Sequence, residues 1–183
     1  MVVVAVVAIS AVAIKSLNEV VWPPHTLLSW RNKHPDAPSG AEQEVSEGLK
    51  EWFVLIKSAN PRMLGMTSVA IDDLWHEIIL DTKFYAYFCE TFVGFFVHHT
   101  TNKANSGIDA ERKEREAAMR TWMSSCYLIG EDPYNPTVLP RLFRLDEQWN
   151  ILNGHYFKLA NDEITESNIN YICPSTWING KDT

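Results

Sequence analysis

Cysteine, glycine and basic side chains are all scarce in this sequence, and each shortage excludes a class of protein. The three cysteines, Cys89, Cys126 and Cys173, are far apart and form no CxxC pair, which excludes a disulfide scaffold or a cysteine-only zinc knuckle and suits a reducing compartment. The eight glycines form no GxGxxG or P-loop motif, and no GxSxG motif occurs. Sixteen Lys and Arg against 23 Asp and Glu give a net charge of −7, so the chain is a poor ligand for nucleic acid, which binds cationic surfaces.

The composition is otherwise that of a folded domain. The chain has 183 residues, of which 46% are hydrophobic and 21% charged. These proportions are close to the globular average, which excludes a wholly disordered chain. A chain of this length can form one domain with a hydrophobic core.

An apolar run opens the chain and is the first of two informative local features. Residues 2–14 carry no charge and are followed by Lys15. At ~1.5 Å per residue this run spans roughly 20 Å as a helix, short of the ~30 Å hydrocarbon core of a bilayer. Residues up to Trp22 can extend the run, and Lys15 can reach the headgroups. We therefore predict an N-terminal transmembrane helix that anchors the chain over residues 1–21.

Two other interpretations of the apolar run remain open. A secretory signal peptide would use the Ala-Val-Ala sequence at residues 11–13 for cleavage, although the basic residues that normally begin such a peptide are missing. A buried strand or helix of a soluble domain would also explain the valines. For a retained anchor, Lys15, Arg31 and Lys33 lie on its C-terminal side, which predicts a single-pass protein of the inner (cytoplasmic) membrane with its C-terminal domain in the cytoplasm.

Hydrophobic periodicity predicts a mainly α-helical domain of four or five packed helices over residues 42–160, after a linker over residues 22–41. Apolar residues recur at helical spacing in the segments 45–56, 71–78, 85–92, 119–127 and 142–149. Ser39 and Ser68 stand where helix N-caps are expected.

The chain becomes polar and rich in turns after the last of these segments. Asn153-Gly154, between short apolar stretches, predicts a tight turn and with it a small β-hairpin. Residues 161–183 are weakly patterned and are expected to form a polar C-terminal tail.

The second informative feature is a group of acidic and histidine residues near the middle of the chain. Asp72, Asp73 and His76 belong to one predicted helix, and His98 and His99 follow the next one. Asp72 and His76 are four residues apart, so on a helix their side chains share one face, where the carboxylate can accept the Nδ1–H of the imidazole and fix its tautomer. Adjacent residues of an extended segment point in different directions, so at most one of His98 and His99 is expected to reach His76.

Three interpretations of this candidate polar site remain open. A metal site would use His76 and His99 as principal ligands and Asp72 as the third ligand or as a supporting carboxylate, with zinc or iron as the ion. An acid–base catalytic site would need no metal. A purely structural role would bond His76 to a backbone carbonyl and pack His99 against Trp75. The spacing does not match HExxH. The other candidates for a third ligand are Asp73, Glu77 and Cys89.

A pattern around the histidines resembles a known family. Its residues are Trp75-His76-Glu77, then Tyr85 with Phe88-Cys89, then Gly94-Phe95 with His98-His99. This pattern is similar to that of bacterial members of the glycine-rich domain-containing protein-like family, over about residues 45–155. The resemblance implies a domain type and a membrane context, because an apolar N-terminal segment often precedes the domain, but it implies no reaction. The chain departs from the family in lacking an arginine before His98 and a glycine-rich tail.

These features predict a membrane-tethered interaction module that acts as an accessory or structural subunit of a larger membrane protein assembly. Its expected partners are the membrane and other membrane-protein subunits, not nucleic acid. No recognised catalytic motif favours an enzyme, and this hypothesis requires no cofactor. The alternative is a metal-binding protein or a metal-dependent enzyme that uses the Asp/His cluster with zinc or iron.

Overall fold

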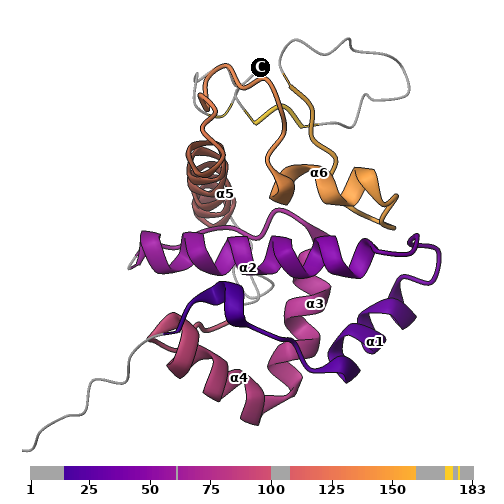
Figure 1. Cartoon of the computed structure of the whole chain (residues 1–183). Helices are drawn as coiled ribbons and strands as arrows, with labels where there is room; N and C mark the ends of the chain where they lie inside the picture. The colour runs from indigo at the N-terminus through magenta and orange to yellow at the C-terminus, as the bar shows by residue number, and fades with distance from the viewer. Residues whose placement is uncertain (1–14, 61, 100–107, 160–171, 175–176, 178–183) are drawn as a thin grey trace, which may run out of the picture.

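The computed structural model describes residues 15–60, 62–99, 108–159, 172–174 and 177. This part of the chain is mainly helical, with six α-helices and no strand (Figure 1). The helices are α1 (Pro24–Lys33), α2 (Ala41–Ala59), α3 (Val69–Leu80), α4 (Thr82–Phe88), α5 (Ile108–Leu128) and α6 (Arg141–Gln148). A 3-10 turn, η1 (Leu17–Glu19), precedes α1, and a π-helical turn, η2 (Cys89–Val93), continues α4.

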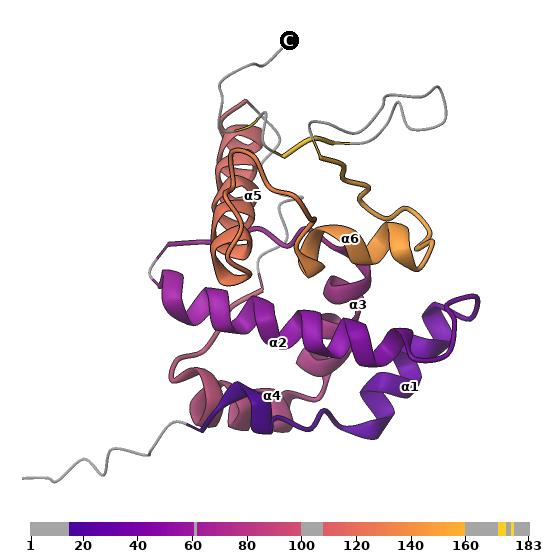
Figure 2. The same cartoon turned by 45° about the horizontal axis from the view of Figure 1, so that its top comes forward.

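The helix α2 is central to this arrangement. In Figures 1 and 2, α5 and α6 lie above α2, and α1 and α4 lie below it. The helix α3 joins the two groups, since it packs against α1, α2, α4 and α6. Gly48 allows α2 to approach α3 and α6 closely, because a Cβ atom at this position would lie 2.8 Å from Ile71 Cδ1 of α3 and 3.0 Å from Leu145 Cδ1 of α6.

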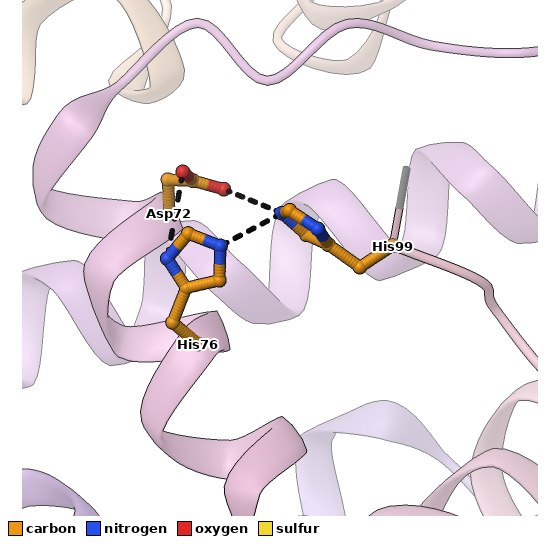
Figure 3. A group of neighbouring side chains, drawn as sticks. All are labelled: Asp72, His76 and His99. Carbon is orange, nitrogen blue, oxygen red and sulfur yellow. Dashed lines mark hydrogen bonds and ion pairs between the residues drawn. The ribbon is translucent and has the colours of Figure 1, made fainter. Parts of the chain in front are cut away.

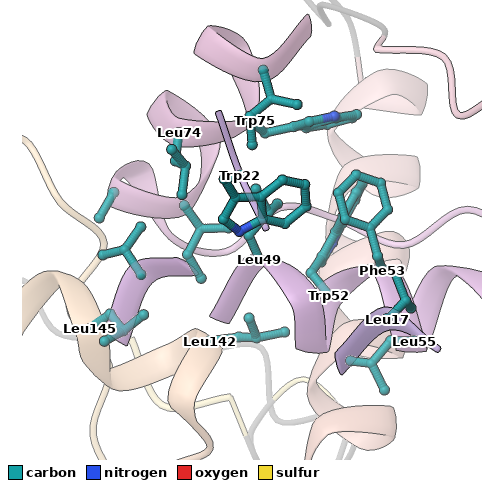
Figure 4. Close-up of a cluster of buried hydrophobic side chains, with 14 of the residues drawn as sticks. Leu17, Trp22, Leu49, Trp52, Phe53, Leu55, Leu74, Trp75, Leu142 and Leu145 are labelled. Atoms are coloured by element: carbon teal, nitrogen blue, oxygen red, sulfur yellow. The ribbon is translucent and has the colours of Figure 1, made fainter. Parts of the chain in front are cut away.

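The hydrophobic core lies between these helices and is rich in aromatic rings (Figure 4). Phe53 of α2 is fully buried, and its ring contacts those of Trp52, Trp75 and Phe88. Trp122 of α5 packs edge-on against Phe143 of α6. These contacts combine area burial with favourable ring geometry, and they hold α3 and α4 against α2.

One of the two N-caps that the sequence predicts is confirmed. The helix α3 covers residues 69–80, and its N-terminus is capped by Ser68, whose Oγ accepts a hydrogen bond from Ile71 N at 3.3 Å. Ser39 does not cap α2; Gly40 takes that position, without a side-chain cap. The prediction of four or five helices is wrong in number, because α1 was not expected.

The helix α1 lies within residues 22–41, which the sequence predicts to be a linker. Pro24 is the first residue of α1, where a proline fits because the first turn requires no backbone donor. Trp30 is buried and donates from Nε1 to the Ala70 carbonyl at 2.8 Å, which joins α1 to the start of α3. Pro24 therefore begins a helix within the segment that was predicted as a linker.

The predicted N-terminal transmembrane helix over residues 1–21 is corrected by the structure. No helix among the described residues is both long and apolar enough to cross a membrane. The end of the predicted anchor belongs to the helical domain: Leu17 and Val20 are buried, and Trp22 packs against Phe88 with ring centroids 5.1 Å apart. Residues 2–14 lie outside the described residues.

The predicted β-hairpin at Asn153-Gly154 is also wrong. Gly154 N donates to the Ile151 carbonyl in a turn, but His155 N donates to the Asp146 carboxylate, so no ladder forms between the two apolar stretches. In the described part of the chain, a single parallel bridge joins Phe157 to Ile172.

Candidate metal centre

Two residues of the candidate polar site, Asp72 and His76, share the outer face of α3. The apolar residues Ile71 and Trp75 of this helix are buried in the core, so the residues that follow each of them lie toward the surface. The i, i+4 spacing brings Asp72 Oδ2 to 3.7 Å from His76 Nδ1. Asp72 and His76 are therefore neighbours as predicted, but at 3.7 Å the carboxylate does not accept the expected hydrogen bond from Nδ1.

His99 reaches the same place from the irregular segment that follows η2. Gly94 ends η2 with a positive φ of 95°, a conformation that glycine adopts without steric cost. His99 Nε2 lies 2.8 Å from His76 Nε2 and 3.6 Å from Asp72 Oδ1 (Figure 3). At 2.8 Å one of the two imidazoles donates a hydrogen bond to the other.

The cluster Asp72–His76–His99 is thus compact and partly open to solvent. Each of its members can place one ligand atom within 4.8 Å of the others. The side chains of Asp72, His76 and His99 retain 34%, 39% and 20% of their exposure. Two imidazole nitrogens and a carboxylate oxygen form a donor set that binds transition-metal ions.

Two of the predicted site residues are not part of this cluster. Asp73 faces α1, where its Oδ2 lies 3.0 Å from His34 Nε2 and its Oδ1 lies 3.7 Å from Lys33 Nζ. His98 is exposed, and its ring packs against that of Phe96. The expectation that only one of the adjacent histidines reaches His76 is confirmed.

The contact between α1 and α3 was missed because His34 and Lys33 lie in the segment predicted as a linker. Lys33 Nζ also lies 2.7 Å from Glu77 Oε1. Partial burial by itself lowers the pKa of Lys33, but the hydrogen bonds and negative charges of Glu77 and Asp73 outweigh it and raise the pKa overall. Asp73 and Glu77 therefore stabilise the helix pair and are not turned to the cluster.

The thiol of Cys89 is not a third ligand. It is buried in the core, and that burial raises its pKa, which disfavours the thiolate that a metal requires. Burial likewise raises the pKa of Cys126 to about 12, with the charges of Glu131 and Asp132 adding to the effect. Both thiols are therefore buried in the core.

The His99 ring also packs against the indole of Trp75. The two ring centroids lie 4.7 Å apart. This contact was predicted as part of the purely structural interpretation, and it occurs together with the cluster. The sequence did not indicate that Trp75 and Tyr85 would share a hydrogen bond, at 3.2 Å between Nε1 and the phenol oxygen.

Fold and cluster together define a mainly helical protein with a two-histidine, one-carboxylate group on its surface. The chain belongs to the UCP032817-like family, an uncharacterised family whose model matches residues 13–176. Comparison with curated proteins and with solved structures gives no match.

The family assignment corrects the resemblance to the glycine-rich domain-containing proteins. Much of the pattern that carried the resemblance is core: Trp75, Tyr85, Phe88 and Cys89 are all buried. Aromatic residues at helical spacing report the packing of a helical domain, and unrelated helical domains meet the same requirement.

Proposed function

We propose that the protein binds a divalent metal ion through Asp72, His76 and His99. One observation carries the proposal: α3 and the segment after η2 bring three potential ligand atoms within 4.8 Å of one another. Two imidazoles and one carboxylate suit zinc, and the same set with open positions is typical of non-haem ferrous iron.

Two of the distances within the cluster are close to those of a metal coordination sphere. In a tetrahedral site with bonds of ~2.0–2.1 Å, ligand atoms lie roughly 3.3–3.4 Å apart. The 3.6 Å between His99 Nε2 and Asp72 Oδ1 is close to that spacing. The two histidine Nε2 atoms, 2.8 Å apart, would separate by about half an ångström to admit the ion.

The solvent exposure of the cluster favours a metal with an open coordination position. Structural zinc sites are usually closed by four protein ligands, whereas catalytic sites have three and keep a position for water. His76 retains 39% of its side-chain exposure. We therefore expect water or another small ligand to complete the coordination, as a metal-dependent enzyme requires.

Metal analysis of the purified full-length chain tests the proposal. After incubation with zinc or ferrous iron and removal of the unbound ion, we expect about one equivalent in the wild type and a loss in His76→Ala and Asp72→Asn. His98→Ala and Asp73→Asn are matched controls, because they change the neighbouring residue of the same type outside the cluster. Metal retained by His76→Ala, or lost equally from the controls, would contradict the proposal.

The open position has a separate test. Cobalt(II) bound at the cluster absorbs visible light, and its spectrum depends on the number and type of ligands. Addition of azide is expected to change the spectrum of the wild-type cobalt form. An unchanged spectrum would indicate a closed site without an exchangeable ligand.

A second candidate, supported by a different observation, is an interaction module within a larger assembly. The end of α5 exposes Tyr127, Leu128 and Ile129 by 61%, 47% and 43%. Adjacent exposed apolar residues favour a partner-binding surface. Co-purification of a stoichiometric partner that is lost in Tyr127→Ser would support this function, and a chain that remains without partners would count against it.

A further inference from the structure

A buried hydrogen-bond relay lies behind the candidate metal ligands. Trp75 Nε1 donates to the Tyr85 hydroxyl at 3.2 Å, and that hydroxyl donates to the Val97 carbonyl at 2.5 Å. Tyr85 is only 2% exposed. Burial raises its pKa, so the phenol stays protonated and keeps its donor.

The relay ends on the backbone that carries His99. The segment from Gly94 to His99 forms neither helix nor strand, so no regular ladder of hydrogen bonds fixes its position. Val97 is buried and lies two residues before His99. The Tyr85 hydroxyl is therefore a specific anchor for this segment at a point close to the ligand.

The same relay reaches the His99 ring through Trp75. The indole that donates to Tyr85 packs against the imidazole, with centroids 4.7 Å apart. Trp75 precedes His76 on α3, so the residue that contacts the His99 ring belongs to the same helix as the second histidine ligand. Tyr85 and Trp75 thus contact, respectively, the backbone two residues before His99 and the His99 ring.

We infer that Tyr85 is a positioning residue for the metal site, acting through Val97 and Trp75 on His99. This inference rests on the proposed metal-binding function. Residues that orient metal ligands from behind typically change metal affinity by 10–100-fold when altered. In most metal sites such a residue forms a hydrogen bond with the ring nitrogen of the histidine that does not bind the metal. Tyr85 instead acts on the backbone that carries His99, through the Val97 carbonyl.

The test is Tyr85→Phe in the full-length chain, with Tyr87→Phe as the matched control. Both changes remove one phenol oxygen from α4, but Tyr87 is half exposed and its ring contact with Phe92 survives the change. We expect Tyr85→Phe to weaken zinc binding by about tenfold, measured by competition with a chelating dye, and Tyr87→Phe to leave it unchanged. The cobalt(II) spectrum should shift in Tyr85→Phe alone, a readout that general destabilisation does not produce.

A second variant keeps the inference testable if Tyr85→Phe does not fold. Trp75→Phe removes the indole N–H and part of the surface beneath His99, and it is also expected to weaken zinc binding about tenfold. Wild-type affinity and an unshifted spectrum in a folded Tyr85→Phe would overturn this inference and leave the metal site standing. A wild type that binds no metal would overturn the proposed function and this inference with it.

Discussion

Replacement of Asp146 is expected to loosen the junction between α3, α6 and the segment that follows α6. Its carboxylate is 1% exposed and accepts hydrogen bonds from the Ser68 hydroxyl at 2.6 Å, from Val69 N at 2.8 Å, from Ala70 N at 3.2 Å and from His155 N at 2.8 Å. Two of the four donors are the first backbone N–H groups of α3, which no residue inside that helix can satisfy. A negative charge at this end also favours the helix dipole.

The size of the effect follows from the number of donors that lose their partner. A hydrogen bond to a charged group contributes about 1.5–3 kcal/mol, but bonds that share one carboxylate are not additive. A buried donor left without a partner costs about 1–3 kcal/mol, and because four donors share this one acceptor we expect Asp146→Ala to lower the free energy of unfolding by about 3–5 kcal/mol. Domains are stabilised by only about 5–15 kcal/mol, so the loss is a large share of the total.

Asp146→Asn separates the hydrogen bonds from the volume of the side chain. The amide keeps the shape and one acceptor oxygen, but its NH₂ group faces backbone donors such as Val69 N or His155 N. We expect a loss of about 2–3 kcal/mol. The matched control is Asp132→Asn, because Asp132 caps an exposed turn through Tyr134 N and is expected to cost less than about 1 kcal/mol.

Urea denaturation followed by circular dichroism measures these differences in free energy. The reasoning fails if Asp146→Asn unfolds within about 0.5 kcal/mol of the wild type, at an unchanged dependence on urea, since the four donors would then not need the carboxylate.

Two further predictions concern ionisable groups. The pKa of Lys33 is raised above its ordinary value of 10.5 in the folded protein. The ion pairs of Lys33 therefore stabilise the fold at neutral pH, and this stabilisation is lost as the pH rises through the raised pKa. Lys33→Met is therefore expected to cost no more than about 1 kcal/mol at neutral pH, because the side chain is 44% exposed, and a cost that persists at strongly alkaline pH would contradict this. Cys126, whose pKa burial raises to about 12, is expected to resist iodoacetamide in the folded protein while the half-buried Cys173 reacts. Mass spectrometry of the labelled peptides checks this, and equal labelling of the two thiols before unfolding would refute it.

The sequence-based predictions were correct where interactions between near neighbours in the chain decide the structure, and wrong where contacts between distant residues decide it. The start of α3 was predicted correctly, because Ser68 and the apolar stripe that begins at Ile71 act within a few residues of one another. The helix α1 was missed, because the segment was predicted as a linker and the helix is held by distant contacts such as that from Trp30 to the Ala70 carbonyl. The hairpin was wrong for a related reason: Asp146 takes the donor of His155 that a hairpin would have used.

The candidate site shows the same division. The pairing of Asp72 with His76 follows from helical spacing, and it is visible in the sequence. The choice of His99 over His98 depends on how the irregular segment after η2 folds back on α3, which the Tyr85 hydroxyl and the Trp75 ring control. No periodicity records that contact, so the sequence named His76, His99 and Asp72 for a metal site but could not remove Asp73 and His98 from the wider candidate polar site.

The sequence by itself determined that the chain is helical, which faces of its helices are apolar, and that Asp72 and His76 stand together, because these properties arise from neighbours along the chain. The tertiary structure alone decided that His99 completes the cluster, that Asp73 turns to α1, and that Asp146 closes the start of α3. Each of these depends on side chains from distant segments competing for the same partners, and only the packed helices fix the outcome of that competition.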